Sequence, residues 1–349
     1  MIIERYLYRE VGQTFFGVFG VLLLIFVSQR FARYLASAAA GDFSAGLLLE
    51  VLASKVIANL VVILPLSFFL AVLLSFGRLY SDSEMTALGA AGVSLRRLTG
   101  ATALLSLGVA AGGLVLALVI GPRASAVGER LEGQARESAD VTGIAGGRFK
   151  VIAGGTRVFY AREITSDRQG MTEVFAHLRD RPRPLLVVAD RGYQMTDPGS
   201  GDRFLVMVDG HLYEGRAGER DIAVTRFREY AVRIRESLVD PGAPGIAEMP
   251  TGALLRTPGA AARAELHWRL AMPLATALLG PLGMLLARTG PRQGPYVRLL
   301  YGILVYVVYT NVLGILRELV DRERLAPEIG LWPAHLAVGL LILALYRRQ

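Results

Sequence analysis

The sequence predicts an α-helical integral membrane protein with six spans, three before and three after an inserted all-β domain. Three observations carry this prediction. Hydrophobic residues make up 53% of the 349 residues, more than the roughly 45–50% of a soluble domain. Six apolar segments lack Asp, Glu, Lys and Arg. A long polar stretch between the third and fourth of these segments is built from short β-rich runs.

The six apolar segments match the thickness of a bilayer. A helix of about 18 residues measures about 27 Å, close to a hydrocarbon core of about 30 Å. An ionised side chain at the centre of a span costs about 2.5–3.5 kcal/mol, so charge-free runs of this length indicate spans. The predicted spans are residues 11–28, 56–76, 98–121, 270–287, 299–316 and 329–346.

The N-terminal residues and the arginine distribution predict the topology. Residues 1–10 mix apolar and charged side chains, which predicts an amphipathic segment along the inner interface before the first span. The loops on that side carry more arginine than the opposite short loops, and arginine-rich loops face the cytoplasm. Both termini are therefore expected in the cytoplasm. The chain is predicted to have three parts. Residues 1–121 hold the first three spans, residues 122–259 the β-domain and its linker, and residues 260–349 the last three spans.

Residues 77–97, between the second and third spans, are polar but patterned. Ser81 and Glu84 have the spacing of a capping box, and Gly92 is placed to end a helix. We therefore expect a short cytoplasmic helix over about residues 81–92, with a small-residue surface and one carboxylate near its start. Such a helix can lie in a groove of a partner protein, and our central hypothesis is that a separate ATPase binds it. The alternative is a capped connector that contacts no partner.

The polar insert predicts an antiparallel sandwich or jelly roll. Short apolar runs separated by Gly and Pro are typical of such domains. Apolar side chains on both faces of residues 204–208 predict a central strand. Residues 241–258 are rich in Pro and Gly and predict a linker, and residues 260–269 a helix that leads into the fourth span. The expected strands are residues 148–152, 156–164, 174–178, 185–195, 203–214 and 222–235.

Several kinds of chemistry have no pattern in this sequence. There is no cysteine, and the four histidines lack the spacing of a zinc site. No Gly-Lys dipeptide occurs, so there is no Walker A loop and this chain is not itself the ATPase. No acidic residue lies within a predicted span, which argues against a proton-coupled carrier. We predict no catalytic, cofactor or metal site, and interpret His335 as a packed or interfacial residue.

Arg30 and Arg33 lie three residues apart at the outer end of the first span, so they share a helix face. Guanidinium groups bind phosphate with two parallel hydrogen bonds. The pair can therefore capture a phosphorylated lipid headgroup. The alternative is interfacial anchoring, in which the long side chains reach toward the headgroups without a specific ligand.

A family pattern runs through seven segments: MIIERYL (1–7), LIFVSQRFAR (24–33), LPL (64–66), residues 77–92 with Ser83 and Glu84, VVADRG (187–192), RAELHWR (263–269) and PRQG (291–294). Together they resemble the lipopolysaccharide export permeases over essentially the whole chain, and the F-type subunit more than the G-type subunit. Each segment alone would be a weak signal.

The resemblance implies the permease subunit of an ABC transporter in the inner membrane of a Gram-negative bacterium. It implies a heterodimer with a G-type subunit, a cytoplasmic ATPase dimer that holds ATP and magnesium, a periplasmic bridge and a single-span regulatory subunit. Lipopolysaccharide would enter between facing spans and leave through the periplasmic β-domain. This chain itself would bind no cofactor.

The resemblance also implies two sites. Glu84 matches the position that couples to the ATPase, with Ser83, Tyr80, Met85 and Leu88 around it. Arg30 and Arg33 match basic residues that meet lipid phosphates; the first is often lysine in relatives. Two other functions remain open: a non-transporting scaffold that relays force from an ATPase to a periplasmic partner, and a secondary transporter.

Overall fold

The computed structural model describes residues 2–40, 45–142, 147–152, 156–165, 170–179, 183–196, 203–215, 222–234, 245–288 and 295–348. The chain divides into two compact units. The membrane unit comprises Met1–Phe31, Glu50–Glu129 and Pro244–Gln349, and the β-unit comprises Ala32–Leu49 and Arg130–Ala243. The matched segment 291–294 and residues 241–244 of the predicted linker lie outside the described residues.

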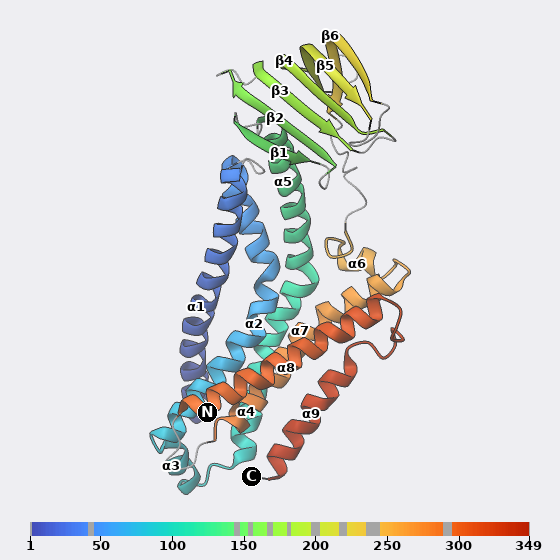
Figure 1. Cartoon of the computed structure of the whole chain (residues 1–349). Coiled ribbons are helices and arrows are strands. Elements are labelled where there is room, and N and C mark those ends of the chain that lie inside the picture. Colours follow the sequence, from blue (N-terminus) through green and yellow to red (C-terminus); the bar gives the residue numbers. More distant parts are fainter. Residues whose placement is uncertain are drawn as a thin grey trace. The chain divides into compact units, whose positions relative to one another are not determined.

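Five helices are long and apolar enough to cross a membrane, judged by length and composition. They are, in chain order, α1 (Ile2–Ala40), α2 (Leu48–Ser81), α4 (Leu95–Val115) with its continuation through the π-helical turn η2 (Leu116–Ile120) into α5 (Gly121–Thr142), α7 (Ala260–Leu286) and α8 (Pro295–Asp321) (Figure 1). The sixth predicted span forms α9 (Trp332–Arg347), whose 16 residues would measure about 24 Å. Three short helical segments join these elements: η1 (Ala45–Leu47), α3 (Glu84–Ala90) and α6 (Thr251–Leu254).

The N-terminal residues form the first turns of a longer helix, and their position along the inner interface stays a prediction. Helix α1 runs without a break from Ile2 to Ala40. Leu7 and Val11, four residues apart and thus on one face, are buried in the same cluster as Phe68 and Phe76 of α2. This packing fixes the first turns of α1 to α2.

Helix α7 is the centre of the membrane unit and packs against α4, α8 and α9. In the most apolar 18-residue stretch of α7, 72% of the residues are buried, against 6% in α1 and 17% in α8. Close approach of α7 to α4 and α2 requires glycine at one point: a Cβ at Gly280 would lie 1.9 Å from Ser106 Oγ and 2.8 Å from Phe68 Cε1. In the outer helices α1 and α8 few residues of the apolar stretch are buried, and the rest are half-buried or exposed.

The β-unit contains an antiparallel sheet, as predicted. Its strands are β1 (Arg148–Ile152), β2 (Arg157–Ile164), β3 (Gly170–Leu178), β4 (Leu185–Thr196), β5 (Arg203–Glu214) and β6 (Ala223–Ile234). They pair in chain order from β1 to β6. The predicted central strand is confirmed: β5 pairs with both β4 and β6, and Leu205, Val206 and Met207 are all buried.

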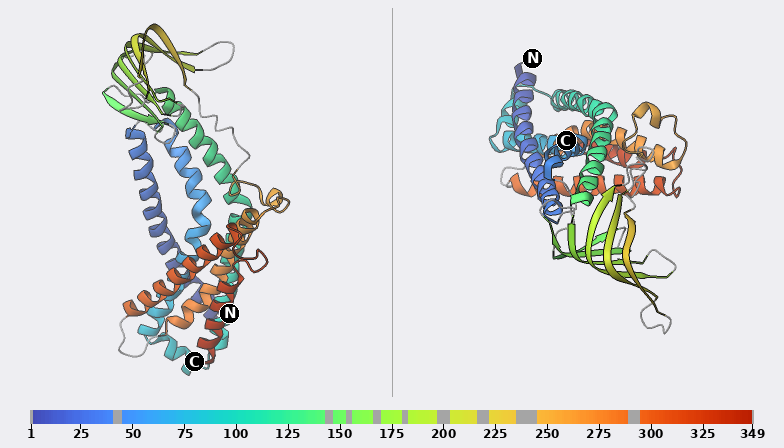
Figure 2. Two further views of the ribbon diagram at one scale, coloured as in Figure 1. Left: turned by 45° about the vertical axis from the view of Figure 1, so that its right-hand side comes forward. Right: turned by 90° about the horizontal axis from the view of Figure 1, so that it is seen from above.

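The described strands lie in one curved sheet rather than in the two packed sheets of a sandwich (Figure 2). Each strand follows its neighbour in the chain, so successive hairpins account for all the pairings. One face carries a cluster of buried side chains that includes Phe159, Ala176 and Val187 at one level of the register. Curvature lets a single sheet enclose this apolar face.

Candidate functional site

Helix α3 begins later than the sequence predicted. Helix α2 continues through Ser81, and α3 starts at Glu84. Ser83 is the N-cap residue, but it has a left-handed φ of 62° and its side chain makes no capping hydrogen bond. The predicted Ser81–Glu84 capping box is therefore wrong, because Leu79 and Phe76 remain packed on the core and keep the last turn of α2 helical.

The end of α3 is formed by Gly92, as predicted. Gly92 has φ +80°, a conformation that glycine adopts without a Cβ penalty. Gly92 N donates to Gly89 O and Val93 N donates to Leu88 O, both at 3.0 Å. This pair of bonds is a Schellman motif, which satisfies the last carbonyl groups of the helix.

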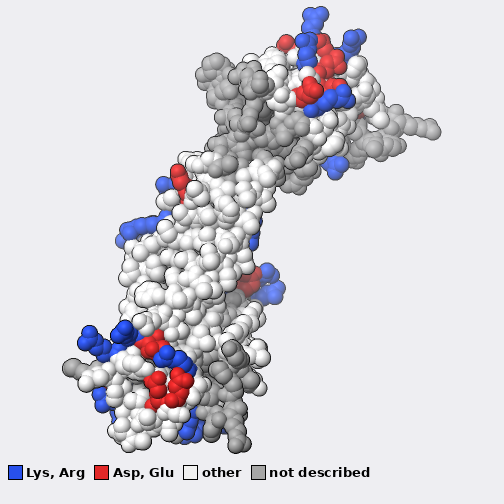
Figure 3. Space-filling view, turned by 90° about the vertical axis from the view of Figure 1, so that its left-hand side faces the viewer, with Lys and Arg blue, Asp and Glu red and all other residues white. Residues whose placement is uncertain are grey.

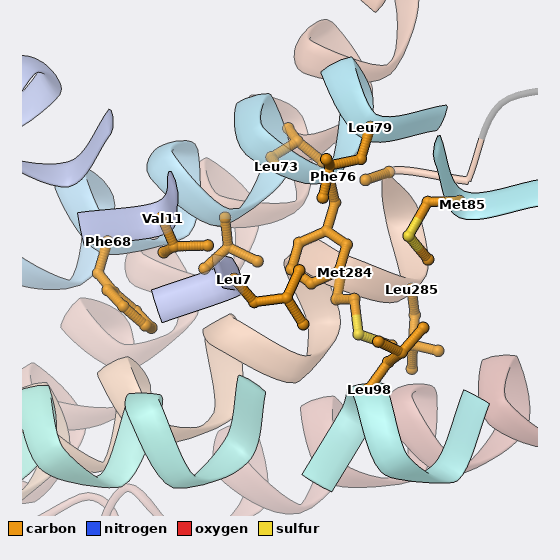
Figure 4. Close-up of a cluster of buried hydrophobic side chains, with 12 residues drawn as sticks. Leu7, Val11, Phe68, Leu73, Phe76, Leu79, Met85, Leu98, Met284 and Leu285 are labelled. Atoms are coloured by element: carbon orange, nitrogen blue, oxygen red, sulfur yellow. The ribbon is translucent and has the colours of Figure 1, made fainter. Parts of the chain in front are cut away.

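One face of α3 is fixed to the membrane unit. Met85 is only 8% exposed and belongs to a cluster that joins α1, α2, α4 and α7 (Figure 4). Leu88 and Tyr80 pack against the same cluster. The labelled members are Leu7, Val11, Phe68, Leu73, Phe76, Leu79, Met85, Leu98, Met284 and Leu285. Any displacement of α3 must therefore disturb packing on four other helices.

The opposite face of α3 is small and exposed. Thr86, Ala87, Gly89 and Ala90 are exposed, and a Cβ added at Gly89 would meet no atom within 4 Å. Packing within this chain therefore does not require these residues to be small. A surface of this kind allows the backbone of another protein to approach closely.

Polar contacts from the first turns of α1 surround α3. Tyr6 Oη donates to Glu84 Oε2 at 2.7 Å. Two ion pairs lie nearby: Arg97 with Glu4 at 2.7 Å and Arg78 with Glu10 at 3.0 Å. Figure 3 shows charged side chains gathered at this end of the membrane unit, beside a broad uncharged surface.

Of these polar residues, only Glu84 was predicted from the sequence as part of the site; Tyr6, Glu4 and Glu10 on α1 were not. A signal was present: if residues 2–13 are read as one helix, Tyr6 and Glu10 are four residues apart and share a face.

Arg30 and Arg33 both lie on α1, three residues apart. The Arg30 guanidinium lies over the Phe26 ring, 5.4 Å from its centroid, and Arg33 is exposed. Within the described part of the chain, no carboxylate forms an ion pair with either guanidinium. Both can therefore accept an anionic ligand.

A family model described as "Lipopolysaccharide export system permease LptF/LptG" matches residues 5–348. The chain belongs to this family. The "Lipopolysaccharide export system permease protein LptF" of Escherichia coli (strain K12) is 31% identical over 350 residues, which cover 99% of this chain and 93% of that protein. The protein of the same name from Shigella flexneri has the same identity and coverage.

These relatives confirm the resemblance to the F-type subunit. Together with the five helices able to cross a membrane, they identify the chain as a multi-pass membrane permease of the LptF/LptG family. Within the described residues no group of three or more His, Cys, Asp or Glu side chains could hold a metal ion.

Proposed function

We propose that this chain is the F-type permease subunit of an exporter that takes lipopolysaccharide out of the inner membrane of a Gram-negative bacterium. It pairs with a G-type subunit and stands on a cytoplasmic ATPase dimer, which binds ATP and magnesium. The lipid then passes to a periplasmic bridge, with a single-span subunit regulating the complex. The family match over residues 5–348 supports the exporter, and the geometry of α3 supports the coupling role.

The observation that carries the coupling role is the two-sided character of α3. Its inner face, with Met85, Leu88 and the adjacent Tyr80, is packed onto four helices. Its outer face is small and exposed, and Ser83 and Glu84 stand at its start. A partner that binds this outer face can therefore move the spans as a unit, with Glu84 as its ionic contact.

The lipid path is proposed along α1 and α8. Few residues in the apolar stretches of these two helices are buried within this chain, which suits a cavity shared with a second subunit. An open pocket of about 470 Å³ lies on α8, lined by Thr310, Asn311, Gly314, Ile315, Glu318 and Leu319. Arg30 and Arg33 on α1 are proposed to bind the lipid phosphates. ATP-driven closure narrows this cavity and expels the lipid toward the β-unit.

The test is Glu84→Ala in the complete complex, with Asp82→Ala as the matched control. Asp82 is an exposed carboxylate two residues away, 4.0 Å from Arg78. We expect Glu84→Ala to weaken association of the ATPase or to uncouple hydrolysis from export, while the thermal midpoint of the membrane protein is unchanged. Asp82→Ala should behave as wild type.

Two results would contradict the proposal. Normal assembly and export by Glu84→Ala would remove the coupling role. A wild-type complex whose ATP hydrolysis does not respond to lipopolysaccharide would favour the scaffold function, because a scaffold needs no lipid-sized cavity.

A further inference from the structure

A buried group of polar side chains on α7 has no role in the function proposed above. Glu265 and Arg269 are only 7% and 4% exposed, and both belong to the RAELHWR segment. Buried charges are costly unless they are paired and hydrogen-bonded. We call these residues, together with Thr251, Trp268 and Arg317, the Arg269 cluster.

Arg269 fastens the segment through which the chain returns to the membrane unit. Its Nε donates to Glu265 Oε1 at 2.9 Å, which orients the guanidinium. The remaining nitrogens donate to Thr251 Oγ1 at 2.9 Å and to the carbonyl oxygens of Met249 at 3.0 Å, Ala247 at 3.1 Å and Ile246 at 3.4 Å. Only the planar fork of arginine presents five donors in this geometry; lysine has three.

Thr251 joins the returning segment, residues 245–250, to the η2 turn, through which the chain runs from α4 into α5. Its hydroxyl accepts from Arg269 and donates to Leu118 O at 2.6 Å. Leu118 lies in η2, the π-helical turn between α4 and α5. Single π-helical turns are frequent at functional sites. The helix that leads to the strands through α5 and the segment that returns from them through residues 245–250 are therefore joined, within the membrane unit, at one hydroxyl group.

Helix α8 reaches the same cluster through Arg317. Its Nη2 donates to Glu265 Oε2 at 2.8 Å, and its guanidinium lies 4.8 Å from the centroid of the Trp268 ring. The Arg317 side chain is 38% exposed, against 4% for Arg269. Glu265 thus uses one oxygen for each arginine and links α7 to α8.

We propose that the Arg269 cluster is a mechanical joint that passes movement of α7 and α8 to the two chain segments that flank the strands, α5 with its η2 turn before β1 and residues 245–251 after β6. This inference rests on the proposed export function and names the residues that carry motion onward. Arg269 is a positioning residue, because it contacts no cargo. A buried ion network is weak evidence for stability, since apolar packing serves that purpose as well or better. The network joins four parts of the chain, namely α7, α8, residues 246–251 and η2, and so constrains how they move relative to one another.

The experiment compares two variants in the assembled complex. Thr251→Val keeps the shape of the side chain but removes the hydroxyl. Arg269→Lys keeps the positive charge but removes the planar guanidinium and its five donors. We expect ATP hydrolysis to stay within about two-fold of wild type while transfer of lipopolysaccharide to a periplasmic acceptor falls about ten-fold. Amide exchange of residues 246–254 should rise about ten-fold, because the segment opens more readily.

Matched controls lie in the same stretch. Thr257→Val removes a hydroxyl that donates to Ala253 O, and Arg256→Lys changes an exposed arginine. Both controls should transfer lipid and exchange amides as wild type does.

Three outcomes would contradict the proposal that the Arg269 cluster is a mechanical joint. Wild-type transfer by both test variants would show that the cluster carries no motion. Hydrolysis and transfer that fall in equal proportion would show a role in stability alone. If the wild-type complex neither hydrolyses ATP in response to lipopolysaccharide nor exports it, the proposed function fails and the joint's role in export fails with it. The amide-exchange difference would persist in that case, which distinguishes the two failures.

Discussion

At the scale of single residues, Tyr6 is predicted to orient Glu84. Removing its hydroxyl in Tyr6→Phe leaves the Glu84 carboxylate free to turn. A hydrogen bond of this kind contributes about 1 kcal/mol, so we expect the ATPase to bind about five-fold more weakly. Titration of the ATPase onto the reconstituted permease measures this change. Tyr8→Phe, on the same helix, is the control.

Comparison with Glu84→Ala decides whether Tyr6 acts through Glu84. The double variant Tyr6→Phe/Glu84→Ala should bind no more weakly than Glu84→Ala alone, because the hydroxyl has lost its partner. Additive losses would mean that Tyr6 contributes independently of Glu84.

The residue-scale prediction for lipid capture concerns Arg30 and Arg33. A basic residue near an anionic membrane surface contributes about 1 kcal/mol, so the double alanine variant should capture lipopolysaccharide roughly ten- to thirty-fold less well. Crosslinking of lipid to the permease measures capture, and the deficit should be larger at low ionic strength, where screening is weak. The double lysine variant keeps the charges and should retain most of the capture. Unchanged crosslinking in the alanine variant would show that the pair only anchors α1.

At this scale, the sequence predicts residues whose role depends on local chemistry. Gly92 was found because a helix end needs a left-handed residue, and Arg30 and Arg33 because three residues separate them. Tyr6 and Arg269 were missed, because their partners lie 78 and about 20 residues away along the chain. The spacing along α1 places Tyr6 and Glu10 on one face, but no local spacing identifies a hydrogen-bond partner in a distant segment.

At the scale of secondary-structure elements, Gly280 is predicted to set the distance between α7 and α4. A Cβ there would clash with Ser106 Oγ and Phe68, and overpacking of this kind costs about 1–3 kcal/mol. Gly280→Ala should therefore lower the thermal midpoint of the purified permease. Gly108→Ala on α4 is the control, since a Cβ there meets no atom within 4 Å, and alanine favours a helix by up to about 1 kcal/mol. Equal stability of the two variants would contradict the close packing.

Helices and strands were predictable where residues close in sequence determine their ends. The six strands agree with the predicted runs, most closely for β1 and β5, because Gly and Pro punctuate an alternating pattern. Strand pairing was not predictable, since a sandwich and a single curved sheet can share the same runs. The start of α3 was misplaced for a similar reason: Phe76 and Leu79 extend α2 through contacts with other helices, and no local capping signal records those contacts.

At the scale of the whole molecule, the exposed apolar surface of α1 and α8 predicts the partner interface. The chain contains no cysteine, so a single introduced thiol reports unambiguously on its own position. Leu24 on α1 and Leu304 on α8 are exposed, whereas Leu279 on α7 is fully buried. We expect Leu24→Cys and Leu304→Cys to crosslink to the G-type subunit or to lipopolysaccharide in the complete complex, and Leu279→Cys to give no crosslink.

The contrast among these three positions depends on the arrangement of helices around α7, which apolar composition alone does not reveal. All six predicted spans are free of Asp, Glu, Lys and Arg, and hydrophobicity does not identify the central helix, since α7 is less hydrophobic than α1 and α8 although it is the more buried. Equal crosslinking at Leu24, Leu304 and Leu279 would mean that α7 is as accessible as α1 and α8, and the proposed lipid path along the outer helices would then have no structural basis.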